Sequence, residues 1–468
     1  MSAESVITRT IRVARGVFAP GHLGELTQVV DFELVDAVIE ETGTRQRRTR
    51  LLPTRVVVYF VLALALFEHC SYRGVWGKLT AGLTGLGLTR PSVSSLSRAR
   101  RRIGVAPLQR LFQTLAGPVA FRGQAGAFYR GLRTVAIDGT SLHVPDHEML
   151  TWRYPKRAGE HNEFGYPLLR LLAVVECGTR AVLAAAFGPE DTGELGYARQ
   201  LLAVLDRTML VLADAGFDAV ELLHDITTTG ASFLVRSSAR RCPTPQRHLP
   251  DGSYLALLGY GILATLLQVR IIEATITITL ADGTTRHEQW RLITNLLDHT
   301  RHPARELVDL YHERWQIETT YFSIKATILD GRVLRSHTPT GIDQEVYALL
   351  TVYQALIRTA ADITTTRPDL DMDRISFTVL HQTAADLVTT ATNILPTGPT
   401  QLIGAIGQAA LTGLLPARHR HRTTPRTRKN RTSKYRPTTR THPATTQTYT
   451  LHTKITFFEH GLAPRAHT

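Results

Sequence analysis

The stretch PLLRLLAVVECGTRAVLAAAFG, residues 167–188, holds two apolar runs that meet at Gly178 and Thr179. Apolar runs of this length, broken by turn residues, predict two strands joined by a tight turn. Further strand-like segments lie on both sides of it, namely GLRTVAID (131–138), TMLVLAD (208–214) and ASFLVR (231–236). Helical periodicity separates the later segments, so the predicted order is strand, hairpin, helix, strand, helix, strand. This succession predicts an α/β fold, a mixed sheet with flanking helices.

Two aspartates mark the ends of these predicted strands. Asp138 closes the first strand and precedes Gly139, and Asp214 closes a later one shortly before Gly216. Ligands of open α/β sheets bind beyond the carboxyl ends of the strands, so both carboxylates are candidate site residues. An Asp and a Gly after a strand are very commonly just an ordinary turn.

A β-rich segment interrupts the α/β pattern between residues 241 and 296. Its β-branched residues alternate with polar ones around an Asp282-Gly283 pair, which is typical of a hairpin turn. We expect this segment to be an insertion that precedes a long helix.

The segment YHERWQIETTYFSIK, residues 311–325, has the periodicity of that helix. Four polar groups fall within an arc of about 60° on one face of an α-helix. They are Tyr311, Arg314, Glu318 and Lys325. Such a stripe either holds a ligand or forms an ordinary ion-pair network on an exposed helix.

Residues 25–125 are predicted to be helical. The longest apolar run, Val56 to Phe67, has 12 residues, whereas a membrane-spanning helix needs about 20, so it predicts a buried helix. A short helix pair at residues 91–115 carries a basic cluster. The cluster consists of Arg98, Arg100, Arg101 and Arg102. It fits a helix-turn-helix that contacts DNA, and it fits a solvated basic face equally well.

The composition predicts a globular protein with a polyanionic partner. The chain has 468 residues, 43% of them apolar, and a formal net charge of +14. Nucleic acid is the expected partner, with an anionic membrane as its rival. The three distant cysteines argue against a disulfide framework, and together with the lack of a signal pattern they predict a cytoplasmic protein. Residues 418–440 hold ten Lys or Arg and no acid, which is typical of a disordered basic tail.

Asp138, Asp214 and Glu318 would repel one another if they converged, unless divalent cations neutralised them. Carboxylate oxygens suit Mg²⁺ or Mn²⁺. Two such ions about 4 Å apart serve in-line displacement at phosphorus. The expected chemistry is therefore phosphodiester cleavage and transfer.

The chain resembles a known family at these residues. The spacing Tyr, two residues, Arg, three residues, Glu, six residues, Lys in residues 311–325 is similar to the signature of the cut-and-paste DDE transposases of the insertion-sequence-four type. VAIDGTSLHVPD (135–146) resembles the block of the first catalytic Asp, and MLVLADAGFD (209–218) resembles that of the second. LRSHTPTGIDQEVYALL (334–350) resembles the segment that follows the signature.

The resemblance implies a ribonuclease-H-like core, interrupted by the β-rich insertion and preceded by an N-terminal helical domain. The implied catalytic and metal-binding residues are Asp138, Asp214 and Glu318, holding two Mg²⁺ ions that Mn²⁺ can replace. The implied DNA-binding residues are Tyr311, Arg314, Lys325 and Trp290. Related enzymes have an aromatic residue at the place of Trp290 that stacks on a flipped base. A Trp packed in the insertion core is the alternative for this residue.

The implied reaction is cut-and-paste transposition on double-stranded DNA, at terminal inverted repeats and at the target, by a homodimer. It proceeds by nicking, hairpin formation, hairpin opening and strand transfer. Three alternatives stay open: an inactive or domesticated transposase acting as a DNA-binding protein, a basic transcriptional regulator, and a nuclease without strand transfer. A bacterial, nucleoid-associated location is expected.

The expected domain boundaries follow from these patterns. An N-terminal helical, DNA-binding part covers residues 1–125. The core occupies 126–240 and 297–362, with the insertion at 241–296 between them. A C-terminal helical segment and the basic tail make up residues 363–468.

Overall fold

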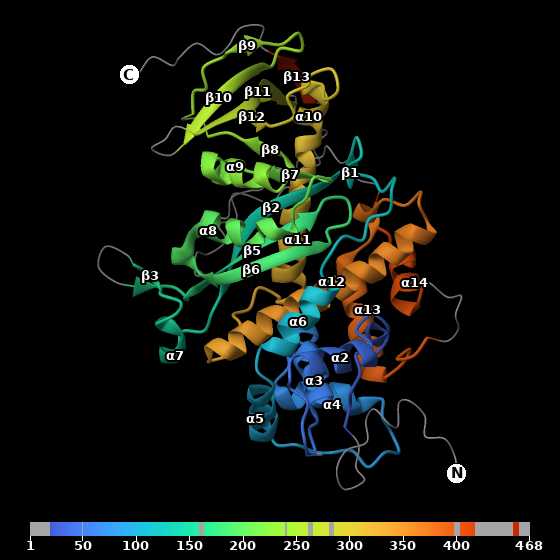
Figure 1. The fold of residues 1–468 in the computed structure, drawn as a ribbon. Helices are drawn as coiled ribbons and strands as arrows, with labels where there is room; N and C mark the ends of the chain where they lie inside the picture. Colours follow the sequence, from blue (N-terminus) through green and yellow to red (C-terminus); the bar gives the residue numbers. More distant parts are fainter. Residues whose placement is uncertain are drawn as a thin grey trace, which may run out of the picture. The chain divides into compact units, whose positions relative to one another are not determined.

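The computed structural model describes residues 19–48, 50–158, 163–238, 241–260, 265–279, 285–396, 403–416 and 453–457 (Figure 1). Contacts divide the chain into two compact units. The first comprises Met1–Leu212, Thr228–Ala231 and Glu313–Pro416, and the second comprises Ala213–Thr227, Ser232–His312 and Ala417–Thr468. The basic residues at 418–440 lie outside the described residues. None of the helices in the described part is long and apolar enough to span a membrane.

Helices from both ends of the chain pack together in the first unit. The early ones are η2 (Leu26–Gln28), α2 (Phe32–Glu41), α3 (Thr54–Leu66), α4 (Tyr72–Ala81), α5 (Val93–Ile103) and α6 (Ala106–Leu115). The late ones are α12 (Pro339–Thr366), η8 (Met372–Arg374), α13 (Phe377–Thr390) and α14 (Ala405–Thr412). Helix α12 lies beside α3 and α6 (Figure 1). The predicted buried helix is confirmed, because α3 begins after Pro53 and Val56 to Leu66 are all buried.

The first unit also contains the predicted sheet. Its strands are β1 (Phe128–Tyr129), β2 (Leu132–His143), β5 (Leu168–Glu176), β6 (Val182–Pro189) and β7 (Met209–Ala213), whose last residue belongs to the second unit. The order is β6-β5-β2-β7, and the hairpin of β5 and β6 is antiparallel, as predicted. The ribonuclease-H-like α/β fold is confirmed, with α8 (Gly193–Leu201) packed against β5 and β6. Smaller elements are α7 (Glu148–Thr151), β3 (Arg157–Ala158), β4 (Glu163–Phe164), η3 (Glu190–Thr192) and η4 (Leu202–Val204).

Strand β2 is longer than predicted. It continues to His143, so the prediction that the strand ends at Asp138 is wrong, and so is the turn interpretation of Asp138-Gly139. Gly139 pairs with Leu172 in the ladder of β2 and β5. A Cβ atom at Gly139 would lie 2.9 Å from Glu194 Oε1 and 3.0 Å from Leu172 Cδ1. The glycine therefore permits close packing inside a strand rather than a turn.

The second unit contains the β-rich insertion. Its elements are η5 (Ala215–Phe217), α9 (Val220–Thr228), β8 (Ser232–Arg236), β9 (Arg247–His248), β10 (Tyr254–Tyr260), β11 (Thr265–Thr279), β12 (Thr285–Thr294), α10 (Ala304–Tyr311) and β13 (Thr453–Phe457). The strand order is β8-β12-β11-β10-β9, and β13 also pairs with β11. The antiparallel pairing of β11 and β12 is as predicted, whereas the Asp282-Gly283 turn lies outside the described residues.

The signature segment 311–325 is not one regular α-helix. Helix α10 ends at Tyr311 and is followed by the 3₁₀ turn η6 (His312–Arg314), by α11 (Trp315–Phe322) and by the π-helical turn η7 (Ser323–Ile328). Because π and 3₁₀ turns rotate differently per residue from an α-helix, the uniform arc of about 60° is wrong for this segment. Arg314 and Glu318, at α-helical spacing, keep their predicted relation.

Candidate active site

Asp138 occupies the middle of strand β2, where its backbone pairs with Ala173 of β5. Its side chain is mostly buried, and Oδ1 accepts a hydrogen bond of 2.8 Å from the Gly139 N–H. Its backbone carbonyl accepts a hydrogen bond of 2.5 Å from the Tyr321 hydroxyl. The sheet and helix α11 therefore both fix the position of this carboxylate.

Arg314 lies between two of the predicted catalytic carboxylates. Its Nη1 is 3.7 Å from Asp138 Oδ2, and its Nη2 is 3.3 Å from Glu318 Oε1. The side chains of Arg314 and Asp138 are each 17% exposed, and that of Glu318 is 23% exposed. The pair of Arg314 and Glu318 is thus more than an ion pair on an exposed helix, because it reaches a carboxylate in the sheet. The structure brings Asp138 and Glu318 together around one cation.

Lys325 lies on the π-helical turn, close to the same strand. Its Nζ donates a hydrogen bond of 3.2 Å to Thr140 Oγ1. Thr140 is two residues beyond Asp138 and therefore on the same face of β2. Burial lowers the pKa of Lys325. An anionic ligand would favour its charged form, because an opposite charge offsets the cost of burial.

Tyr321 is a site residue that the sequence analysis missed. It is buried, and burial raises the pKa of its hydroxyl well above the usual value, so the hydroxyl remains a donor. Tyr321 lies three residues after Glu318, which is the spacing of neighbours on one helix face. That spacing was the available signal, but an aromatic residue there is also typical of core packing.

In the second unit, Asp214 directly follows strand β7, as predicted. Its Oδ1 accepts a hydrogen bond of 2.8 Å from the Gly216 N–H and caps the 3₁₀ turn η5. Tyr311 is buried, and its hydroxyl donates to the carbonyl of Ala213 at 3.0 Å. A second tyrosine of the signature segment thus holds the backbone beside a second predicted catalytic aspartate.

Trp290 lies on β12 opposite Ala274 of β11. It is half-buried, with its ring edge-on to Tyr311 at 5.3 Å between centroids. The Arg236 guanidinium lies 5.5 Å from the centre of the indole, and Nε1 donates to Glu288 Oε2 at 3.1 Å. Trp290 is therefore held in place by an aromatic and a cationic neighbour without being fully covered.

The donor chemistry around Arg314 fits a divalent cation. Asp138 and Glu318 offer hard carboxylate oxygens, and they already share one positive group. Within the part of the chain that the structure describes, no three His, Cys, Asp or Glu side chains are arranged closely enough to hold a metal ion. Of the three predicted metal ligands, Asp138 and Glu318 are the two that the geometry of the first unit brings together.

The predicted basic cluster on α5 serves more than one purpose. Arg100 is buried and hydrogen-bonded within the helical bundle, so its side chain belongs to the core. Arg98, Arg101 and Arg102 are exposed. Part of the solvated-face interpretation is therefore correct, and three cations remain accessible.

Family models match two parts of the chain. Residues 20–113 match a model described as "Insertion element 4 transposase N-terminal", and residues 129–355 match one described as "Transposase DDE domain".

Three known proteins are similar to this chain. It is 28% identical over 342 residues to "Transposase InsG for insertion sequence element IS4" of Escherichia coli (strain K12), covering 71% of this chain and 75% of that protein. It is 26% identical over 187 residues to "Putative transposase InsZ" of the same organism, covering 40% of this chain and 61% of that protein. The solved structure titled "Cryo-EM structure of piggyBac transposase synaptic complex with hairpin DNA (SNHP)" has a TM-score of 0.39 and 10% identity, covering 81% of this chain and 82% of that one.

The two matching models follow one another along the chain and together cover most of its described residues. The chain therefore belongs to the DDE transposases of the insertion-sequence-four type, enzymes that cleave and join DNA with the help of divalent metal ions.

Proposed function

We propose that this chain is a cut-and-paste transposase that excises an insertion sequence by nicking, hairpin formation and hairpin opening, and then joins it to target DNA. The observation that carries the proposal is the Arg314 guanidinium between Asp138 and Glu318. Two carboxylates gathered around a cation, on a strand and a helix of a ribonuclease-H-like core, suit chemistry on a phosphodiester.

Asp138, Asp214 and Glu318 would hold two Mg²⁺ ions, with Mn²⁺ as a substitute. When bound, such ions activate an attacking oxygen and stabilise a leaving oxygen at phosphorus. The carboxylate oxygens of Asp138 and Glu318 are hard donors that suit such ions, and both side chains lie beside Arg314. Asp214 is included in the proposed set because MLVLADAGFD resembles the block of the family's second catalytic aspartate.

The basic side chains of the signature segment would bind the DNA backbone. Arg314 offers a planar guanidinium suited to a phosphate, and Lys325 offers an ammonium close to Thr140. Tyr311 supports this contact by holding the start of the segment to the Ala213 carbonyl. Trp290 would stack on the base that leaves the duplex when a hairpin forms.

The proposed reaction consists of four phosphoryl transfers at one site. Water first cleaves one strand at the end of the element, and the freed 3′-hydroxyl attacks the opposite strand to form a hairpin. Water then opens the hairpin, and the 3′-hydroxyl finally attacks the target DNA. Because two element ends must be brought together, we propose a homodimer on paired DNA.

The proposed division of labour follows the predicted domain boundaries. Residues 1–125 would bind DNA, and residues 126–240 and 297–362 would carry the catalytic core. The insertion at 241–296 would present Trp290, and residues 363–468 would add helical support and a basic tail.

The test is a cleavage assay with Mg²⁺ and a duplex that carries the inverted repeat flanking this chain's own gene. A denaturing gel should show nicks and hairpins at the repeat boundary for the wild type, and neither product for Asp214→Asn or Glu318→Gln. Glu313→Gln removes a neighbouring carboxylate and should retain cleavage. A wild type that binds the repeat without cutting it would favour an inactive or domesticated transposase. An active Glu318→Gln variant would overturn the site assignment.

A further inference from the structure

A cleft of about 950 Å³ lies in the first unit, and none of the carboxylates described above lines it. It is bounded by the residues that follow α3, the start of α4, one side of α5, and the segment 331–344 that leads into α12 and includes its first turns. Every residue that lines it belongs to the same compact unit. The cleft is therefore a feature of one body of the protein.

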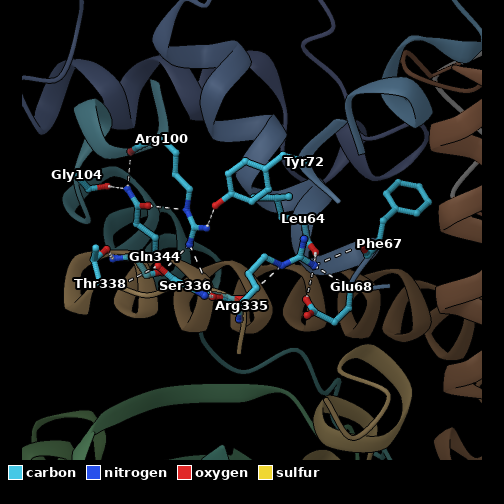
Figure 2. A network of polar contacts seen from close by, with 12 residues as sticks. Leu64, Phe67, Glu68, Tyr72, Arg100, Gly104, Arg335, Ser336, Thr338 and Gln344 are labelled. Carbon is cyan, nitrogen blue, oxygen red and sulfur yellow. Dashed lines mark hydrogen bonds and ion pairs between the residues drawn. The ribbon is translucent and has the colours of Figure 1, made fainter. Parts of the chain in front are cut away.

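Arg335 fixes one side of the cleft to the end of α3 (Figure 2). Its guanidinium donates to the backbone carbonyls of Leu64, Cys70 and Glu68, each at 2.9 Å. It also donates to Glu68 Oε2 at 2.6 Å. A cation at the C-terminus of a helix is favourable, because the last carbonyls have no partner within the helix. Arg335 thus ties the segment before α12 to α3.

Arg100 fixes the other side in a similar way (Figure 2). It donates to Gln344 Oε1 at 2.9 Å, to the Gly341 carbonyl at 2.6 Å and to the Tyr72 hydroxyl at 2.5 Å. Gln344 in turn donates to the Arg100 carbonyl at 2.9 Å. Helices α4, α5 and α12 are therefore locked together around a preformed cleft.

The floor and rim of this cleft carry a positive balance. Two guanidiniums in the floor, Arg100 and Arg335, lie near two carboxylates, Glu345 and Glu68. Burial raises the pKa of Glu68 to about 7, so that carboxyl is partly protonated near neutral pH. The rim adds two exposed arginines, Arg101 and Arg332, beside two exposed histidines, His69 and His337. One exposed acid contacts this rim, because Asp330 lies 3.9 Å from Arg332.

Three helices begin at the cleft and reinforce this balance. Ser71 caps α4, Val93 starts α5 and Thr338 caps α12, and all three line the cleft. None of these three helices has an acidic residue in its first turn. Their positive ends therefore add to the charge of the arginines, because no acid in the first turn of these helices offsets them.

We propose that this cleft binds the phosphate backbone of a DNA strand, with Arg101 and Arg332 as the phosphate contacts. The proposal rests on the proposed function, because DNA is the polyanion on which this family acts. Exposed arginines on a rigid, polar floor suit phosphate oxygens, which accept hydrogen bonds from guanidinium groups and hydroxyls. The site would position DNA without reading its sequence.

The test compares DNA affinity for the full chain and for Arg101→Ala/Arg332→Ala, in EDTA, so that binding is measured without cleavage. The probe is a fluorescent duplex carrying the inverted repeat, and a scrambled duplex of equal length is measured beside it. We expect the double variant to bind both duplexes on the order of 10- to 100-fold more weakly near 0.1 M salt. The slope of log affinity against log salt should shrink by about 2.

The matched control is Arg207→Ala/Arg367→Ala, which removes two exposed arginines that lie outside residues 1–125 and do not line the cleft. This control should keep the wild-type affinity and slope. A cross-linking experiment gives a second readout, since p-benzoylphenylalanine in place of exposed Val93 should label DNA and the same substitution of exposed Leu395 should not. Unchanged affinity and slope in the cleft variant, or no cross-link at Val93, would overturn the proposal. Because neither measurement depends on cleavage, a chain that failed the cleavage assay would still test the cleft.

Discussion

Among single side chains, Tyr321 bonds directly to the backbone of a predicted catalytic residue. It donates to the backbone carbonyl of Asp138 at 2.5 Å from a buried position. Tyr321→Phe keeps the ring and removes this hydrogen bond, so the strand loses one restraint at the carboxylate. We expect slower metal-dependent DNA cleavage and a higher Mg²⁺ concentration at half-maximal rate, with DNA binding in EDTA unchanged. A titration of cleavage rate against Mg²⁺ measures this.

A control for Tyr321→Phe has to remove the same kind of bond elsewhere. Tyr59 is buried, and its hydroxyl donates to the Val30 carbonyl at 2.8 Å. Both substitutions leave a buried carbonyl with one bond fewer and should cost about 1 to 3 kcal/mol of stability. Only the first should change the Mg²⁺ requirement. Equal Mg²⁺ curves for the two variants would limit Tyr321 to a role in stability.

His22 gives a prediction for the pH dependence of stability. Its Nδ1 accepts from the Gly24 N–H at 3.2 Å and its Nε2 lies 3.1 Å from the Leu79 carbonyl, so the neutral ring with a proton on Nε2 satisfies both partners. Burial lowers the pKa of His22 from 6.5 to about 4. Between pH 6.5 and about 4, His22 is protonated in the unfolded chain and neutral in the folded chain. The free energy of unfolding therefore falls as the pH falls.

The expected loss for His22 is roughly 2 kcal/mol between pH 7 and pH 5, at about 1.4 kcal/mol per pKa unit. Thermal unfolding midpoints of the wild type and of His22→Gln, measured across this range, check it. The thermal unfolding midpoint of the wild type should fall more than that of the variant as the pH falls. Parallel curves would show that His22 does not contribute to the acid sensitivity.

The sequence predicted contacts between side chains that are close together in the chain. It missed contacts between residues that are far apart in the chain. Arg314 and Glu318 are four residues apart, so helical geometry alone predicted their contact. Tyr321 and Asp138 are far apart in the chain, and the pairing of strand and helix that joins them is a tertiary feature. Arg100 looked like one cation of an exposed row, yet its side chain is buried against α12.

Among the helices and strands, the sequence predicted the kind of element better than its ends. The apolar run of α3 and the hairpin of β5 and β6 follow from hydrophobicity alone. Strand β2 passes through Asp138-Gly139 because its pairing with β5 continues beyond these two residues to His143. Cross-strand pairing of this kind outweighs the local turn preference of Asp and Gly, and a single sequence does not reveal it.

Arg335 tests how strongly the segment before α12 is tied to α3. Arg335→Gln would leave Glu68 and Glu345 in a buried place without their shared cation, and several carbonyls at the end of α3 would lose a donor. Breaking a buried ion pair from one side costs about 3 to 5 kcal/mol. We expect a clearly lower thermal unfolding midpoint, which differential scanning calorimetry measures. Arg335→Lys keeps the charge but lacks the planar guanidinium. Its unfolding midpoint should lie between those of the wild type and Arg335→Gln.

Arg367 provides the comparison for Arg335. It pairs with Asp369 at 3.2 Å, and both side chains are mostly exposed. Arg367→Gln should leave the unfolding midpoint almost unchanged, because exposed ion pairs contribute little. Equal midpoints for Arg335→Gln and Arg367→Gln would mean that the Arg335 network does not hold α3 and α12 together.

Across the complete chain, the positive charge is concentrated near one end of the sequence. Ten Lys or Arg residues lie between residues 418 and 440, so replacing all ten by Gln would lower the net charge from +14 to +4, since 14 − 10 = 4. These residues precede β13, so neutral substitution leaves that strand's sequence intact, whereas truncation would remove it. The prediction therefore concerns charge alone.

The neutralised chain should bind DNA of any sequence more weakly, and its affinity should depend less steeply on salt, because each lost phosphate contact removes about 0.9 from the log–log slope. Titration of a scrambled duplex at several salt concentrations measures this. Cleavage at the inverted repeat should persist at low salt and saturating protein, because Asp138, Asp214 and Glu318 are untouched. A slope equal to that of the wild type would mean that these cations do not reach phosphate, and the exposed arginines of the first unit would then have to supply the electrostatic part of DNA binding.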